Sequence, residues 1–290
     1  MIPCLFATDL HGHIDRYEKL FEIVAADPPA ALFLGGDLLP SPLIPPSAGE
    51  PRHHDFLNGF LGAELGRMRT KLGTRYPRIF VILGNDDGRF MEAAVIELAT
   101  RGVWTYAHDR RASFGRHAVY GYSCVPPTPF LLKDWERYDV SRFVDPGCVS
   151  PEEGRRSVPV SESEARYGTI AEDLKRLVGQ DDVRDAICLF HTPPYRTALD
   201  RAALDGQMVD HAPLDVHVGS IAVERFIKAR QPLLTLHGHV HESARLTGSW
   251  QDRIGRTHLF GAAHDGPELC LVRFDPENLA TAKRELHPLR

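Results

Sequence analysis

The sequence has few cysteines, and they lie far apart. Five cysteines occur among 290 residues, an odd number, and Cys4, Cys188 and Cys270 each sit within an apolar, strand-like run. A disulfide-bonded secreted domain would show a denser set, and a zinc knuckle would place its cysteines in closely spaced pairs. We therefore interpret the cysteines as reduced core residues and expect a cytoplasmic protein.

Long apolar runs are missing as well, and we expect no N-terminal leader. No stretch approaches the roughly 18 consecutive apolar residues that suggest a membrane-spanning helix. The first residues carry no basic segment and soon reach Asp9, which is typical of a first core strand and not of a signal peptide. The sequence thus predicts a protein that makes no membrane contact.

An excess of basic charge is also absent. The chain has 39 acidic and 34 basic residues, for a formal net charge of -5. Broad nucleic-acid binding needs a surplus of Lys and Arg, so the composition argues against it. A small phosphorylated substrate stays compatible, because bound dications would add positive charge that this count leaves out.

Strand-like and helix-like segments alternate along most of the chain, which predicts βαβ units with a parallel sheet. A stretch rich in Pro, Gly and charge, residues 126–163, interrupts the alternation and indicates a lid or a loop excursion. We expect one domain over residues 1–290 with this insertion. The expected strands are 2–8, 30–34, 78–83, 103–106, 117–122, 186–190, 232–236, 257–260 and 269–274, and the expected helices are 14–26, 56–72, 89–100, 164–178 and 221–229.

Side chains of metal-ligand type directly follow one predicted strand after another. In α/β sheets the loops beyond the carboxyl ends of the strands converge on one edge, so these side chains should meet there. His and carboxylate oxygens bind borderline divalent metals, and two such ions about 3.5–4 Å apart can clamp a phosphate and activate a hydroxide between them. The expected ligands are Asp9, His11, Asp37, Asn85, His191, His239 and His241.

The blocks Asp9-x-His11, Gly36-Asp37, Gly84-Asn85, His191 and Gly238-His239-x-His241 resemble, in that order, the signature blocks of the calcineurin-like metallophosphoesterases. The resemblance implies an α/β fold, a four-layer α/β/β/α sandwich of two mixed sheets flanked by helices. It implies hydrolysis of phosphomonoesters or phosphodiesters at a dinuclear centre. It also implies the ligand sets: Asp9, His11 and His241 for one ion, Asn85, His191 and His239 for the other, with Asp37 bridging them. The metal stays open among Mn, Fe, Zn and Ni, with Mn²⁺ favoured.

One position departs from the family pattern. The third block usually reads Gly-Asn-His, and this chain has Asp86 in place of that catalytic His. A carboxylate beside two dications should be ionised, which makes it a poor proton donor and repels a phosphate oxygen. We expect slow turnover, a preference for good leaving groups, or a substitute donor, for which His13 and His217 are the possibilities.

Several roles stay open from the sequence alone. Ser220 suits a substrate pocket or a helix N-cap equally well, Tyr195 suits ligand stacking or loop packing, and Asn85 would contact substrate as well as metal. His13 also suits a helix start. The alternative function is a metal-binding phosphate-ligand or scaffold protein with weak catalysis, and a nuclease is less favoured. The physiological substrate and the oligomeric state leave no readable signal.

Overall fold

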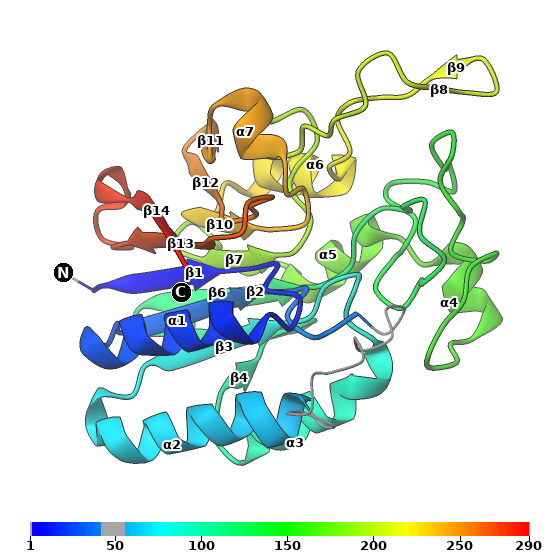
Figure 1. The fold of residues 1–290 in the computed structure, drawn as a ribbon. Helices are drawn as coiled ribbons and strands as arrows, with labels where there is room; N and C mark the ends of the chain where they lie inside the picture. Colours follow the sequence, from blue (N-terminus) through cyan, green and yellow to red (C-terminus); the bar gives the residue numbers. More distant parts are fainter. Residues whose placement is uncertain (1, 42–55, 290) are drawn as a thin grey trace.

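The computed structural model describes residues 2–41 and 56–289. Two six-stranded sheets stack face to face, with helices covering the outer face of each (Figure 1). The predicted four-layer sandwich is therefore confirmed. Part of the Pro-rich loop between residues 40 and 51, together with His53 and His54, lies outside the described residues.

The first sheet has the order β14-β13-β1-β2-β3-β4. Strands β1 to β4 are parallel to one another, β13 pairs antiparallel with β1, and β14 pairs antiparallel with β13, so the sheet is mixed. Its strands are β1 (Cys4–Ala7), β2 (Ala31–Gly35), β3 (Arg78–Ile82), β4 (Thr105–Tyr106), β13 (Leu269–Phe274) and β14 (Lys283–His287).

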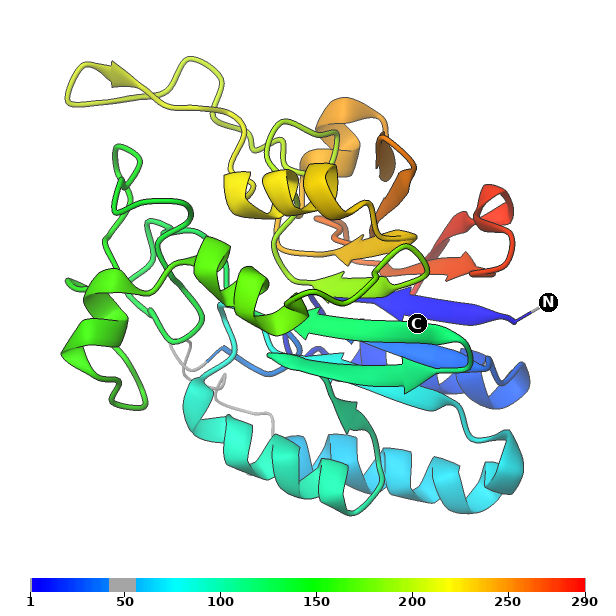
Figure 2. The same ribbon diagram turned by 180° about the vertical axis from the view of Figure 1, so that it is seen from behind.

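The second sheet has the order β11-β12-β10-β7-β6-β5, with a parallel centre and antiparallel strands at both edges. Its strands are β5 (Arg110–Phe114), β6 (His117–Tyr122), β7 (Ile187–Phe190), β10 (Leu234–His237), β11 (Gln251–Ile254) and β12 (Thr257–Gly261). A separate hairpin joins β8 (Met208–Val209) to β9 (Ala212–Pro213) and projects from the body of the molecule (Figures 1 and 2).

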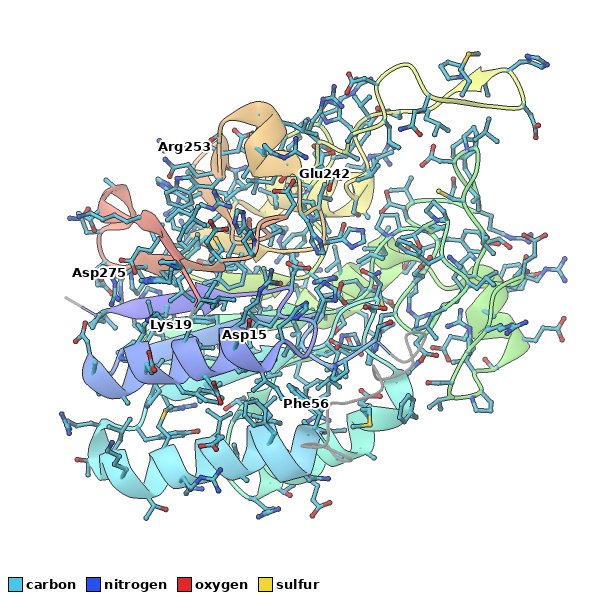
Figure 3. All side chains as sticks on the ribbon, viewed as in Figure 1. Asp15, Lys19, Phe56, Glu242, Arg253 and Asp275 are labelled. Carbon is cyan, nitrogen blue, oxygen red and sulfur yellow. The ribbon has the colours of Figure 1, made fainter. Side chains whose placement is uncertain are left out.

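Helices α1 (Ile14–Ala26), α2 (Ala63–Leu72) and α3 (Glu92–Thr100) lie on the side of the first sheet, and α5 (Ile170–Val178) and α6 (Ile221–Arg230) on the side of the second (Figures 1 and 2). The structure also has the short helices α4 (Glu162–Tyr167) and α7 (Ser243–Thr247). Phe56, marked in Figure 3, belongs to the π-helical turn Phe56–Gly62 before α2, and its ring meets that of Tyr17 on α1 at 5.5 Å.

Alternation along the strands divides the core into layers. Phe6 and Phe33 face the space between the sheets, whereas their chain neighbours Leu5 and Leu34 face the helices, as the two-residue period of a strand requires. Phe33 stacks on Phe80 at 5.1 Å inside this inner layer. Both faces of each sheet are buried, which explains why the central strands read as continuous apolar runs.

The predicted helix 164–178 is wrong at one point, because the chain forms two helices there. Gly168 ends α4, and Thr169 adopts an extended conformation and accepts a hydrogen bond from the backbone N–H of Glu172. A side-chain cap of this kind starts a new helix, so Thr169 acts as the N-cap of α5. Between residues 123 and 161, all of which the structure describes, the chain has turns and isolated bridges only.

Candidate metal centre

The loops after β1, β2, β3, β7 and β10 meet at one edge of the sandwich. Four of the expected ligands in these loops adopt positive φ angles that side-chain-bearing residues seldom take: Asp9 (56°), His11 (47°), Asp37 (51°) and His239 (73°). Neighbouring loops hold this backbone in place, because Asp9 N donates to the Gly36 carbonyl at 3.0 Å and His11 N to that of Asp37 at 2.8 Å. Strained backbone of this kind persists where the surrounding structure over-determines it.

Glycines let these loops approach one another closely. A Cβ atom on Gly84 would lie 2.4 Å from Asp37 Oδ1 and 2.6 Å from His191 Nε2. A Cβ atom on Gly238 would lie 2.6 Å from Asp9 Oδ2. The glycines of the third and fifth sequence blocks are thus required by the packing of the ligands themselves.

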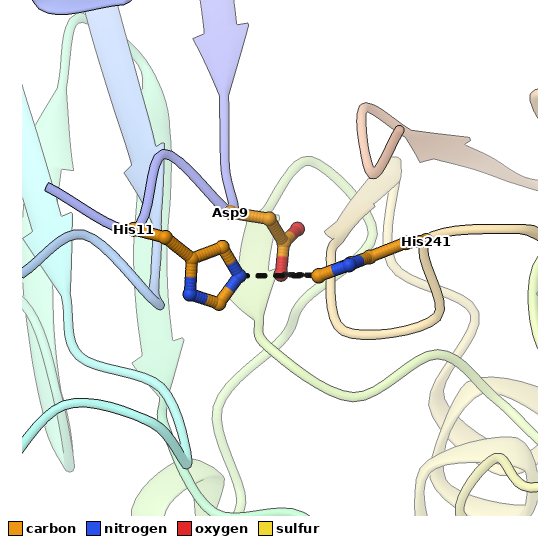
Figure 4. A group of neighbouring side chains, drawn as sticks. All are labelled: Asp9, His11 and His241. Atoms are coloured by element: carbon orange, nitrogen blue, oxygen red, sulfur yellow. Dashed lines mark hydrogen bonds and ion pairs between the residues drawn. The ribbon is translucent and has the colours of Figure 1, made fainter. Parts of the chain in front are cut away.

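Asp9, His11 and His241 form the first group of ligands (Figure 4). His11 Nε2 and His241 Nε2 face each other at 3.3 Å, and His241 Nε2 lies 3.2 Å from Asp9 Oδ1. The backbone N–H of His239 also donates to the Asp9 carboxylate, which links this group to the second one. Asp9 is buried, and the two imidazoles are partly exposed.

Asp37, His191 and His239 form the second group, and Asn85 joins it. His191 Nε2 lies 3.2 Å from Asp37 Oδ2 and 3.1 Å from Asn85 Oδ1. His191 Nδ1 lies 2.8 Å from the Gly35 carbonyl, which fixes the ring so that Nε2 is presented to the other ligands. The bridging role of Asp37 stays a prediction.

The carboxylates of the site change the protonation of its histidines. Burial opposes a proton on His11, yet the hydrogen bond to Asp86 and the charge of Asp37 outweigh it and raise the pKa of His11 to about 9. Burial likewise opposes a proton on His191, and Asp37 raises the pKa of that residue to about 9. Burial and the charge of His191 lower the pKa of His239 to about 3. The cluster of acids therefore attracts positive charge.

The residues present fit divalent cations. In each group the three ligand atoms lie within 4.8 Å of one another, and every one is an imidazole nitrogen or a carboxylate oxygen. Two imidazole nitrogens that face each other at 3.3 Å are well suited to share a cation. Cations bound here would supply the positive charge that the histidine protons otherwise provide.

The structure also shows the local contacts of the remaining expected site residues. His13 is the exposed N-cap position of α1. Tyr195 donates to Asp215 Oδ2 at 2.5 Å. Ser220 caps α6 by accepting from Val223 N at 3.0 Å, so the N-cap alternative accounts for its position.

His217 is held by a buried carboxylate. His217 Nδ1 lies 2.8 Å from Oδ1 of the fully buried Asp200, and its ring lies edge-on to the ring of Tyr195 at 6.1 Å. Two hydrogen bonds tie residues 203–220, which include His217, to the loops that carry His191 and His241. Ser220 N donates to Pro193 O at 2.9 Å, and Ala203 N donates to the Glu242 side chain at 3.1 Å.

Two residues that support the site were missed by sequence reasoning. Asp87 is fully buried and accepts hydrogen bonds from the backbone N–H groups of Leu38, Leu39 and Gly84, which joins the second loop to the third. Arg16 on α1 donates to the Asp9 carbonyl at 3.2 Å. The repeated Asp at 86 and 87 was a visible signal for the first, whereas nothing in the sequence singled out the second.

Two arginines of the 126–163 insertion form ion pairs with carboxylates of the protein. Arg137 pairs with Glu164 and Asp173, and Arg142 pairs with Glu152 at 2.8 Å. Arg137 lines a cavity of about 510 Å³ between α5 and the loop after β4. The Arg137 pairs join the insertion to α4 and α5, whereas the Arg142–Glu152 pair lies within the insertion.

No helix in the described residues is long and apolar enough to cross a membrane. No curated protein matches the chain. Among solved structures, TT1561 of Thermus thermophilus is 18% identical over 99% of both chains, with a TM-score of 0.53. A phosphopantetheinyl hydrolase from Mycobacterium tuberculosis is 10% identical over 90% of this chain and 89% of its own, with a TM-score of 0.52. At such identities these likenesses concern the fold alone.

The sequence also matches a known protein family, over far more residues than any single motif covers. The match is to the calcineurin-like phosphoesterases and spans residues 2–243, which include every expected metal ligand. The two mixed sheets and the two groups of ligands at their edge agree with that match. The chain belongs to the calcineurin-like phosphoesterase family, whose members are metal-dependent hydrolases of phosphoric esters.

Proposed function

We propose that the protein hydrolyses phosphomonoesters or phosphodiesters with the help of two divalent cations, for which Mn²⁺ is favoured. The observation that carries this proposal is the adjacency of two complete ligand groups at one edge of the fold. The first consists of Asp9, His11 and His241, and the second of Asp37, His191 and His239, with Asn85 beside it.

Two cations so held supply a clamp for the phosphate, an activated water and stabilisation of the charge that develops on the leaving oxygen. The protein keeps the donors apart from bulk water, since Asp9, Asp37 and His191 are all buried. Their positions are fixed before substrate arrives, because backbone hydrogen bonds and close glycine contacts hold the loops. Electrostatic stabilisation by groups that need no reorganisation is usually the largest contribution to catalysis.

We assign His217 the protonation of the leaving group. The Asp200 carboxylate accepts the Nδ1 proton, which leaves Nε2 as the nitrogen that exchanges a proton with substrate. His217→Gln should lower kcat most for alkyl phosphates, whose leaving groups need a proton, and little for 4-nitrophenyl phosphate, whose leaving group does not. An equal loss with both substrates would contradict this assignment.

A second candidate function, a phosphate-ligand or scaffold protein with weak catalysis, is favoured by the absence of a histidine at position 86. The direct comparison is between the natural protein and Asp86→His. If the substitution increases kcat by orders of magnitude over a nearly inactive parent, the scaffold function is the better one. A natural protein that is already active, with a kcat similar to that of Asp86→His, favours the hydrolase.

The experiment that tests the hydrolase uses the Mn²⁺-loaded protein and a panel of phosphomonoesters, phosphodiesters and cyclic nucleotides, with EDTA-treated protein as the control. We expect metal-dependent turnover of a small phosphorylated substrate, since a net charge of -5 disfavours nucleic acid. Turnover of none of the panel would reject the proposal, and selective cleavage of nucleic acid would identify a nuclease. The cytoplasmic location stays part of the proposal, supported by five free cysteines.

A further inference from the structure

We propose that Asp86 is a positioning residue for the cation held by Asp9, His11 and His241, through its contact with His11. This inference rests on the metal binding of the proposed function and deepens it. It gives a role to the residue that replaces the histidine of the family pattern. The role is to orient a metal ligand, and not to contact the substrate.

Both carboxylate oxygens of Asp86 are engaged inside the protein. Oδ2 lies 3.2 Å from His11 Nδ1, and Oδ1 accepts a hydrogen bond from Ser41 Oγ at 2.7 Å. The backbone N–H of Asp86 donates to Asp37 Oδ1 at 2.7 Å, which fixes the residue between the two ligand groups. A side chain tied at both oxygens and at its backbone is directed at its protein neighbours.

The geometry at His11 is the one a metal-binding imidazole needs. Its Nδ1 faces the Asp86 carboxylate, and its Nε2 faces His241 across 3.3 Å. The carboxylate accepts the Nδ1 proton, selects the tautomer with a lone pair on Nε2, and makes that nitrogen a stronger donor. A positive φ of 47° at His11 already restrains the backbone, so Asp86 completes the restraint at the ring.

A neutral histidine at position 86 would offer at most one acceptor nitrogen and no charge. Asp86 therefore contacts His11 in place of the substrate, and this contact strengthens the binding of one cation. The second group has a different arrangement, because His191 Nδ1 is 2.8 Å from the Gly35 carbonyl. Substitution of Asp86 should therefore weaken one cation and leave the other unchanged.

The test measures Mn²⁺ binding to the full chain by calorimetry and by the EPR signal of free Mn²⁺. Asp86→Asn keeps the shape and removes the charge, and Asp86→Ala removes the acceptor. Glu285→Gln is the matched control, because Glu285 lies 3.2 Å from His287 Nε2 and each side chain is 26% exposed, close to the 22% and 27% of the His11–Asp86 pair. Circular dichroism checks that each variant is folded. If Asp86→Ala is unfolded, the isosteric Asp86→Asn variant alone tests the positioning role.

We expect one of two Mn²⁺ equivalents to weaken by about 10-fold in Asp86→Asn and by up to about 100-fold in Asp86→Ala, the range found when such supporting groups are removed. Glu285→Gln should bind both equivalents as the natural protein does. Any loss of turnover in Asp86→Asn should be restored by raising Mn²⁺ to saturation, since a positioning residue acts on occupancy.

Three results would overturn the inference: unchanged affinity for both equivalents, equal weakening of both, or a loss of kcat that persists at saturating Mn²⁺. The last would make Asp86 a substrate contact. If the natural protein binds a single ion that Asp86→Asn weakens, the positioning role stands and the two-cation function fails. If it binds no ion, both fail.

Discussion

Replacing Gly84 by alanine should dismantle the second ligand group. The new Cβ would lie 2.4 Å from Asp37 Oδ1 and 2.6 Å from His191 Nε2, whereas ordinary contacts begin near 3.4 Å. Relief of the overlap requires a shift of about 1 Å at one ligand, several times the roughly 0.2 Å tolerance of a metal–ligand distance. The clash also involves backbone, since Asp37 N would be 2.5 Å away.

We therefore expect Gly84→Ala to lose one Mn²⁺ equivalent and about 100-fold or more in kcat/KM. Crowding of this kind should lower the free energy of unfolding by about 1–3 kcal/mol without abolishing the fold. The assays are metal analysis after reconstitution, turnover of an aryl phosphate and urea denaturation.

The chain offers a matched control for this substitution. Gly66 lies within α2, and a Cβ atom there would meet nothing within 4 Å. Gly66→Ala should leave metal content and turnover unchanged and raise stability by about 0.5–1 kcal/mol, because alanine is the better helix former. If Gly84→Ala behaves like Gly66→Ala in metal content and turnover, the account of the ligand packing is refuted.

Three further predictions concern pH and stability. The pKa values of His11 and His191 are both raised to about 9, so these rings carry protons at neutral pH that a metal must displace. The affinity for Mn²⁺ should therefore rise as the pH increases towards 9 and level off above it. Equal proton release on Mn²⁺ binding at pH 7 and pH 10, measured by calorimetry, would contradict this. Lys133→Met should lower the free energy of unfolding by about 3–5 kcal/mol, because it leaves the buried Glu136 without its cation; a denaturation curve that matches the natural protein would refute it. Phe33→Ala should lower the free energy of unfolding by a similar amount, about 3–5 kcal/mol, because it leaves a cavity between the sheets; urea denaturation measures this, and the metal content should stay unchanged. A decrease below about 1 kcal/mol would show that the neighbouring side chains fill the cavity.

Much of the fold follows from local patterns in the sequence. The strands that carry the site read as apolar runs because both faces of each sheet are covered, and the expected helix 14–26 coincides with α1. The candidate ligands could be picked out from the sequence because each follows a strand, and parallel strands deliver their ends to one edge. The edge strands β5, β11 and β14 were missed, since they are half exposed and carry no continuous apolar run.

The parts of the site that were not predicted depend on contacts between distant residues. Asp86 and His11 are 75 positions apart, and Asp200 and His217 are 17 apart, so neither pair leaves a local pattern. The family resemblance assigned position 86 a catalytic role, but its side-chain partners depend on how the second loop folds over the third. A sequence can therefore indicate the ligands, whereas the groups that orient them need the structure.

The central claim is that two cations bind side by side at this edge, and anomalous diffraction from Mn²⁺-loaded crystals tests it most directly. The account predicts two anomalous peaks about 3.5–4 Å apart, one beside Asp9, His11 and His241 and one beside Asp37, His191 and His239. A single peak, or peaks away from these residues, would contradict it.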